Sequence, residues 1–262
     1  MSFNSLRTFM SWRYPIRLIV LICGLFLIAT GIVCMYRSAL GLDPWSVLHQ
    51  GISRHTPLSF GTATIVVGAF ILLLGLLLKV YPGVGTLLNL VLIGIFVDWQ
   101  LRLNWLPDLS GQPLLLRLLV NTIGVLLSGL GVAFYIAPGM GAGPRDGVML
   151  RLHVLTKMRI SIVRATLECF VLLIGFLLGG TVGIGTLIFA FGIGPAIEIS
   201  FGLIKKLRFI EFLLFTTVDP PIKPALERSA PTLSKTSCEH SQALADVGTF
   251  NFSRTEGDVT KF

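Results

Sequence analysis

The sequence predicts an all-α polytopic membrane protein with six transmembrane helices. These form two inverted three-helix repeats, each with an extra short helix after its first span. Three observations lead to this prediction. Charged residues make up only 13% of the 262 residues and apolar residues 53%, whereas a soluble domain carries about 25% charged residues. Uncharged runs long enough to cross a bilayer recur along the chain. The two halves of the chain also resemble each other at a constant offset of 100 residues.

The composition argues against several other functional classes. The net charge of +8 is typical of cytoplasmic loops in a membrane protein, so it does not point to a nucleic-acid partner. The four cysteines form no C-x-x-C pair and predict neither a disulfide framework nor a metal site. The chain has no Walker motif and no dinucleotide-binding glycine motif. We therefore expect no cofactor, no metal and no nucleotide-driven transport.

The six spans follow from the uncharged runs and the glycines that interrupt them. The last uncharged run is divided at Gly179-Gly180, because consecutive glycines disfavour a continuous helix. Each span is about 20 residues long, which matches a hydrocarbon core of about 30 Å at roughly 1.5 Å per residue. The predicted spans are 16–36, 58–79, 85–104, 115–137, 160–179 and 185–205.

The basic residues predict which ends of the spans face the cytoplasm. With the amino terminus inside, twelve Lys and Arg residues near the membrane lie on the cytoplasmic side and four on the outer side. Residues 1–15 are then a cytoplasmic amino terminus. Residues 216–262, rich in Pro, Ser, Thr and charges, are predicted to be a disordered cytoplasmic tail. The segment 206–215 fits either an amphipathic helix on the inner leaflet or an extension of the last span.

The internal repeat relates 16–104 to 115–205. Between 17–100 and 117–200, 21 of 84 gapless positions are identical, and Gly, Pro, Thr and Arg are among the matched residues. Three spans are an odd number, so the second repeat must cross the membrane in the opposite sense to the first. Many secondary transporters have this architecture, with a substrate site where the two repeats meet. Channels and scaffolds can also be built in this way.

Each repeat contains a short segment after its first span that begins like a helix. Pro44 and Pro144 suit the first helical position, and Asp43 can cap the exposed N–H groups. Helices of 11–13 residues are too short to span. In one interpretation they are half-helices whose positive ends, helped by Arg145, face an anionic or polar substrate group. In the other they lie flat at the interface, with Trp45 as a headgroup anchor.

The fifth predicted span contains the strongest single polar candidate, Glu168. It lies roughly 12 Å into the span, where an unpaired charge costs several kcal/mol. Arg164 can pair with it at i,i+4. The pair is either a substrate-coordinating or proton-carrying group, or a helix–helix salt bridge. Together with the short segments, the candidate substrate-binding residues are Asp43, Pro44, Ser46, Pro144, Arg145, Asp146, Arg164 and Glu168.

Other polar residues and the glycines have structural interpretations. Asp98 and Glu198 are related by the repeat and are either gate or capping groups, or ordinary interfacial acids. Asn89 and Asn121 are expected to bridge helices by hydrogen bonds. His49 flanks the first short helix and is expected at the interface. The glycines within the spans are expected to permit close helix packing.

The residues around both short segments resemble the YczE/YyaS/YitT family of bacterial integral membrane proteins, in its YczE-like branch. The likeness covers residues 14–205. Its motifs are Gly-Leu-Asp-Pro-Trp at 41–45, Phe-Gly-Thr-Ala at 60–63, Gly-Val-Gly-Thr-Leu-Leu-Asn at 83–89, Gly-Ala-Gly-Pro-Arg-Asp-Gly at 141–147 and Gly-Thr-Val-Gly-Ile-Gly-Thr-Leu at 180–187.

The resemblance implies a multi-pass protein of the bacterial cytoplasmic (inner) membrane, and it supplies no substrate. Members of this family commonly read Pro-Trp-Asp in the first short segment. This chain has Ser46 at the acidic position, so only Asp146 retains that acid here.

The functional hypothesis is a secondary transporter for a small polar or anionic solute, working by alternating access of the two repeats. The alternative is a non-transporting scaffold or regulatory partner of another membrane protein. The partners that these hypotheses require are the lipid bilayer, a solute, and a second copy of the chain or a membrane partner protein. An enzyme is not expected, because the spans contain no Ser/His or metal-ligand constellation.

Overall fold

The computed structural model describes residues 13–141 and 143–206, and this part of the chain is entirely helical. Six of its helices are long and apolar enough to cross a membrane. They are α2 (Arg13–Ser38), α4 (Phe60–Leu77), α5 (Val84–Leu103), α6 (Leu114–Ile136), α8 (Ile160–Leu177) and α9 (Ile184–Lys206). The six predicted spans are confirmed to within three residues at each end. The predictions for the amino terminus, for the 206–215 segment beyond Lys206 and for the tail fall outside the described residues, apart from the first turn of α2.

The two remaining helices are the short ones predicted after the first span of each repeat. They are α3 (Pro44–His55) and α7 (Pro144–Thr156), and each begins at its proline. The side chain of Asp43 caps α3, where its Oδ2 accepts a hydrogen bond from the Ser46 N–H at 3.3 Å. Proline at the first position and a capping carboxylate before it are the signals that placed this helix start in the sequence.

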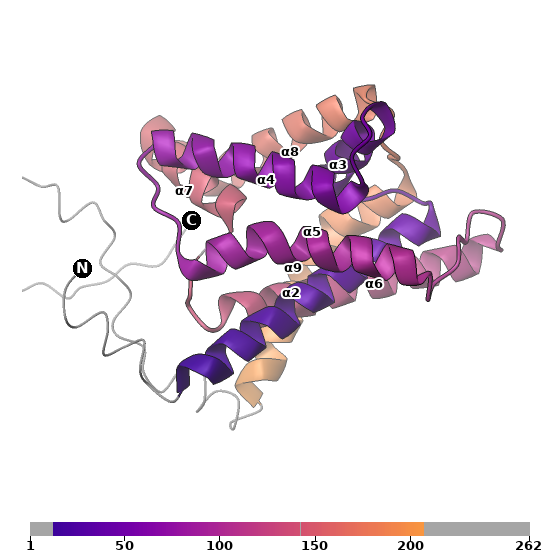
Figure 1. Ribbon diagram of the computed structural model, residues 1–262, viewed down its shortest axis with the longest axis horizontal. Coiled ribbons are helices and arrows are strands. Elements are labelled where there is room, and N and C mark those ends of the chain that lie inside the picture. The colour runs from indigo at the N-terminus through magenta and orange to yellow at the C-terminus, as the bar shows by residue number, and fades with distance from the viewer. Residues whose placement is uncertain (1–12, 142, 207–262) are drawn as a thin grey trace, which may run out of the picture. The chain divides into compact units, whose positions relative to one another are not determined.

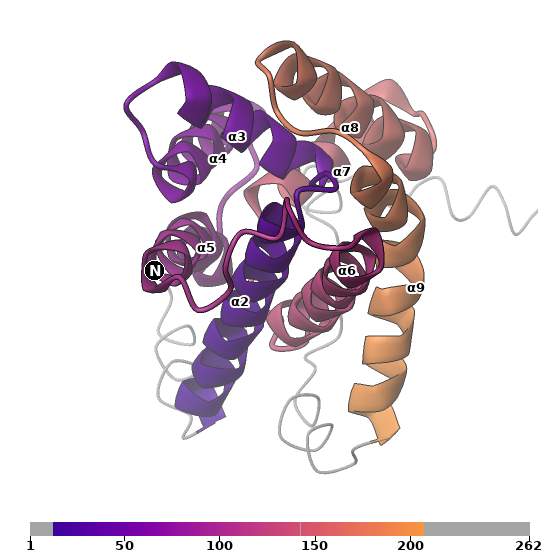
Figure 2. The ribbon, with the colours of Figure 1, turned by 90° about the vertical axis from the view of Figure 1, so that its right-hand side faces the viewer.

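The eight helices form two layers, and each layer contains helices from both halves of the chain. One layer holds α2, α5, α6 and α9, and the other holds α3, α4, α7 and α8 (Figures 1 and 2). Within the first layer α5 packs on α2, and α9 packs on α6. Within the second layer α3 packs against α8, and α7 against α4. Each layer therefore combines two helices of the first half with two helices of the second half.

Helices α2 and α6 cross at the centre of the first layer through small residues. A Cβ on Gly24 would lie 2.8 Å from the Gly131 carbonyl oxygen, and a Cβ on Gly124 would lie 2.8 Å from that of Gly31. Only glycine allows two helix backbones to approach this closely. The two contacts are reciprocal. Gly24 meets Gly131, and their counterparts 100 positions away, Gly124 and Gly31, meet each other. The expected role of the glycines within these spans is confirmed at this crossing.

The loops that precede the short helices make a second set of reciprocal contacts. The Gly85 N–H donates to the Met140 carbonyl and the Gly185 N–H donates to the Leu40 carbonyl, both at 2.9 Å. The third span of each half therefore begins against the loop that leads into the short helix of the other half. The starts of α3 and α7 are held by this contact in equivalent places.

The two hairpins that follow the short helices differ. In the first hairpin α4 and α5 are packed together, and a Cβ on Gly94 of α5 would overlap the Gly61 carbonyl oxygen of α4. In the second, α8 and α9 diverge after the turn that joins them (Figure 2). The residue equivalent to Gly94 is Gly194, and a Cβ there would have no neighbouring atom within 4 Å. The two layers are thus in close contact at α4–α5 and separated at α8–α9.

Candidate functional site

A cavity of about 370 Å³ lies between the two layers and is lined by residues from all eight helices or their first turns. Its size falls in the range of small-molecule sites, about 300–1,000 Å³. Of its 29 lining residues, 24 form twelve pairs whose members stand 100 positions apart in the sequence. Equivalent positions of the two halves therefore build one shared cavity.

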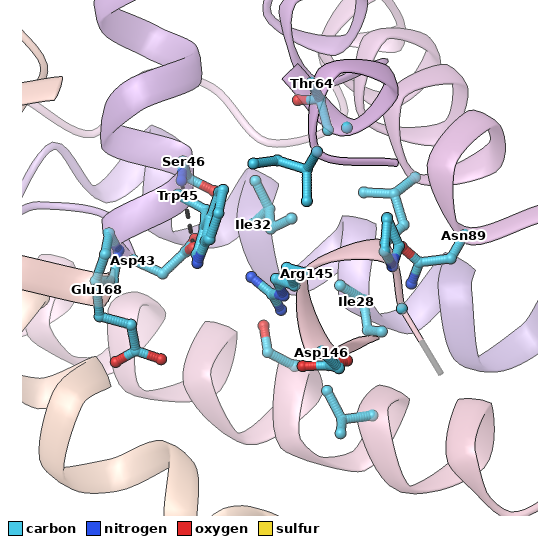
Figure 3. Close-up of a pocket in the computed structure, with 18 of the residues that line it drawn as sticks. Ile28, Ile32, Asp43, Trp45, Ser46, Thr64, Asn89, Arg145, Asp146 and Glu168 are labelled. Atoms are coloured by element: carbon cyan, nitrogen blue, oxygen red, sulfur yellow. Dashed lines mark hydrogen bonds between the residues drawn. The ribbon is translucent and has the colours of Figure 1, made fainter. Parts of the chain in front are cut away.

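All eight residues predicted to bind a substrate line this cavity. The starts of α3 and α7 supply six of them, and α8 supplies Arg164 and Glu168. Figure 3 shows the polar side chains gathered around these helix starts, with the branched apolar side chains Ile28 and Ile32 of α2 beside them. The structure brings the predicted residues together, and their role in binding a substrate stays a prediction.

The start of α3 places a buried carboxylate and an aromatic ring at the cavity. Asp43 is only 5% exposed. Its Oδ2 caps the helix, while its Oδ1 has no hydrogen-bond partner in the part of the chain that the structure describes. Trp45 lines the cavity, and the guanidinium carbon of Arg145 lies 6.0 Å from the centre of its ring. This distance is typical of a cation–π contact. Trp45 therefore faces the cavity and the other half of the chain, unlike a headgroup anchor.

The start of α7 carries the cation and a second carboxylate. Asp146 lies in the first helical turn, and a Cβ on Gly143 would be 2.9 Å from its Oδ2. The carboxylate thus lies beside the helix amino terminus, where the helix dipole favours a negative charge. Just before the helix, the Tyr135 hydroxyl of α6 donates to the Gly141 carbonyl at 3.1 Å and fixes the loop.

The pair predicted in the fifth span is present. Arg164 Nε lies 2.9 Å from Glu168 Oε1, and both side chains line the cavity with part of their surface exposed. The pair lies within α8, four residues apart, so the contact does not join two helices. The structure therefore contains an ion pair within one helix, and not the helix–helix salt bridge that was one of the two predictions.

His49 is a site residue that sequence reasoning placed incorrectly. It was expected at the interface, but it is 8% exposed and lines the cavity one turn after Trp45. Its Nδ1 lies 3.2 Å from the hydroxyl of Thr64, a second lining residue that the sequence analysis did not select. Burial lowers the pKa of His49 to about 3, with a smaller effect from the positive charge of Arg145. The available signal was its i,i+4 spacing from Trp45, which places both residues on one helix face.

Asp98 and Glu198, the predicted gate or capping residues, lie outside the cavity and behave differently. The Gly61 N–H donates to Asp98 Oδ1 at 2.7 Å, and the Ser59 hydroxyl donates to Oδ2, so Asp98 caps the start of α4. Glu198 is exposed on α9, and none of the described residues forms a hydrogen bond or ion pair with it. The repeat-related pair thus contains one capping residue and one residue without a partner among the described residues.

Of the two asparagines expected to bridge helices, Asn121 has this role, whereas Asn89 lines the cavity. The Nδ2 of Asn121 donates to Ser38 Oγ at 3.1 Å and to the Gly41 carbonyl at 3.3 Å, which ties α6 to the loop before α3. Among the residues that the structure describes, no group of three or more His, Cys, Asp or Glu side chains is arranged to hold a metal ion.

Comparison with known proteins identifies relatives without an assigned activity. Residues 15–201 match a family described as a family of unknown function (DUF6198). An uncharacterized protein of Haemophilus influenzae is 36% identical over 74% of this chain and 87% of its own length. The uncharacterized membrane protein YczE of Bacillus subtilis is 34% identical over 68% of this chain and 81% of its own. The uncharacterized protein YyaS of Bacillus subtilis is 28% identical over 63% and 82%. No solved structure matches the chain.

Proposed function

Since the chain belongs to DUF6198, a family of YczE-like membrane proteins of unknown function, we propose its activity from the cavity: it is a secondary transporter for a small polar solute. The solute is held between the starts of α3 and α7 and crosses by alternating access. The observation that carries the proposal is that a cavity with charged and polar side chains in its lining, built from equivalent positions of both halves, lies among six apolar helices.

The proposal includes an inverted repeat. The reciprocal contacts at the α2–α6 crossing and at the two loops support it, because two copies related by a two-fold axis make each contact twice. Basic residues cluster where the second half would reach the cytoplasm, which supports the opposite insertion of the two halves. In this arrangement both termini are cytoplasmic and the protein lies in the bacterial inner membrane.

The difference between the hairpins supports alternating access. Asp98 closes the layers at the start of α4, whereas the equivalent region around Glu198 is open. With cytoplasmic termini, the open region faces the cytoplasm and the closed one faces outward. In the opposite state Glu198 would meet the start of α8 and Asp98 would leave α4. Because each layer contains helices of both halves, we propose that the two layers move relative to each other, rather than the two halves.

Disulfide cross-linking tests this motion in a variant without the four native cysteines. The pair Ser59→Cys and Asp98→Cys reports the closed α4–α5 contact, and the pair Arg159→Cys and Glu198→Cys, 100 positions further along the chain, reports the equivalent α8–α9 contact. We expect each pair to cross-link and each cross-link to block solute uptake into proteoliposomes. Single-cysteine variants are the control.

The scaffold alternative predicts a different result. A static scaffold would cross-link only at 59 and 98, the pair that the structure places in contact. Failure of the 159–198 pair to cross-link in folded protein would therefore overturn alternating access. Simultaneous cross-linking of both pairs in one molecule would overturn it as well, because the two contacts must exclude each other.

A further inference from the structure

The charged groups around the cavity are unequal in number. Three carboxylates line it, Asp43, Asp146 and Glu168, against two guanidinium groups, Arg145 and Arg164. Arg164 and Glu168 neutralise each other at 2.9 Å. Two carboxylates and one guanidinium then remain, and neither Asp43 nor Asp146 has a salt-bridge partner among the described residues. One negative charge of the cavity is left without a matching cation.

Asp43 is the carboxylate for which this imbalance matters most. Only 5% of its surface is exposed, and only one of its two carboxylate oxygens is hydrogen bonded within the described residues. A buried charged oxygen without a partner is costly, and the cost disappears when a donor or a cation reaches it. The unpartnered oxygen therefore points to a ligand that carries a positively charged donor group.

The carboxylates at the starts of α3 and α7 also favour a positively charged ligand. Free helix amino termini favour anions, but here the end of α3 is capped by Asp43 and the first turn of α7 already carries Asp146. An anionic ligand would be repelled by both carboxylates. The anionic solute expected from the sequence is less favourable than a cationic one for this reason.

Aromatic and apolar residues complete the site. The Arg145 guanidinium carbon lies 6.0 Å from the centre of the Trp45 ring. A ligand's cationic group can interact with this ring where it displaces the guanidinium or takes the other face. Branched side chains of α2, α5, α6 and α9 form the opposite walls, among them Ile32, Ile93, Val132 and Ile193. Such walls favour a hydrocarbon body on the ligand.

We propose that the cavity binds a small organic cation, a protonated amine or quaternary ammonium compound with an apolar body. Its cationic group lies between the Asp43 carboxylate and the Trp45 ring, and its hydrocarbon part lies against the isoleucine and valine side chains. The inference rests on the proposed function, in that it identifies the cavity as the substrate site.

Three probes with one body and different charge test the proposal on the purified full chain at pH 7. They are phenethylamine (a cation), phenethyl alcohol (neutral) and phenylacetate (an anion), and the readout is the shift of the unfolding temperature with probe concentration. We expect phenethylamine to stabilise the wild type and to bind at least about tenfold more tightly than either of the other probes.

Asp43→Asn removes the charge and keeps the helix cap, because asparagine caps helices about as well as aspartate. We expect this variant to lose the phenethylamine shift. The matched control Asp108→Asn removes an exposed carboxylate outside the cavity and away from the proposed gate contacts, and it should keep the shift. If Asp43→Asn fails to fold, the comparison of the three probes on the wild type still decides the sign of charge.

The proposal is overturned if phenylacetate stabilises the wild type as well as phenethylamine does, if phenethylamine gives no shift, or if folded Asp43→Asn keeps the full shift. These results are separate from transport. Charge-dependent binding without uptake into proteoliposomes would contradict the proposed function and leave the site intact. Uptake of the anion but not of the cation would support the transporter and contradict this inference.

Discussion

The hairpins α4–α5 and α8–α9 come from equivalent parts of the two halves, yet one is closed and the other open. In the first, Gly61 and Gly94 let the backbones touch, and Asp98 accepts hydrogen bonds from the start of α4. In the second, Gly194 faces open space and Glu198 has no partner among the described residues. The glycine and the acid that the two hairpins share thus occur in two packing states within one molecule. The helices of a hairpin can therefore form whether or not they are in contact across the two layers.

The largest expected difference between the hairpins is at their central glycines. Gly94→Ala should lower the free energy of unfolding by about 1–3 kcal/mol, because the new methyl group would overlap the Gly61 backbone. The matched Gly194→Ala has space for its methyl group and removes a flexible glycine from a helix. It should be neutral or stabilise by up to about 1 kcal/mol. Thermal unfolding of both variants in one detergent measures the difference. Equal destabilisation would show that α8 and α9 are packed as tightly as α4 and α5.

A smaller difference is expected at the two acids. Asp98→Ala removes the acceptor of the Gly61 N–H and the Ser59 hydroxyl and should destabilise the protein by about 1–2 kcal/mol. Glu198→Ala removes an exposed side chain and should change stability by less than about 0.5 kcal/mol. The measurement is again the unfolding midpoint. A large effect of Glu198→Ala would mean that the α8–α9 region spends much of its time closed.

The smallest effect on stability is expected at the ion pair that only the second hairpin carries. Glu168→Gln breaks a partly exposed i,i+4 contact with Arg164, which is worth about 0.5 kcal/mol or less. The equivalent positions of α4 are Thr64 and Gly68, so the first hairpin has no ion pair at this place. The double variant with Arg164→Gln is the control, and its effect should be close to that of the single variant. A loss above about 2 kcal/mol would mean that Glu168 joins α8 to another helix.

Much of the fold and part of the site were predictable because their signals are local. Long uncharged runs fixed the spans, and proline after a capping aspartate fixed the start of α3. The repeat marked Arg145 and Asp146 as counterparts of Trp45 and Ser46, and all four side chains line the cavity. His49 and Thr64 were missed, because a polar residue on a short helix looks the same in sequence whether it faces a cavity or an interface.

The sequence by itself determined the six apolar helices, the two short helices and the equivalence of the two halves, since these depend on hydropathy, capping residues and matched positions. Only the tertiary structure decided that helices of both halves share each layer. It also decided that, among the described residues, Asp98 has a partner and Glu198 has none, and that one oxygen of Asp43 is left unpaired beside the cavity. The two repeat-related hairpins share a glycine at 94 and 194 and an acid at 98 and 198, but they differ at Gly61 and Ser161. Which hairpin closes depends on contacts between helices. Those contacts join residues far apart in the chain, and no local signal records them.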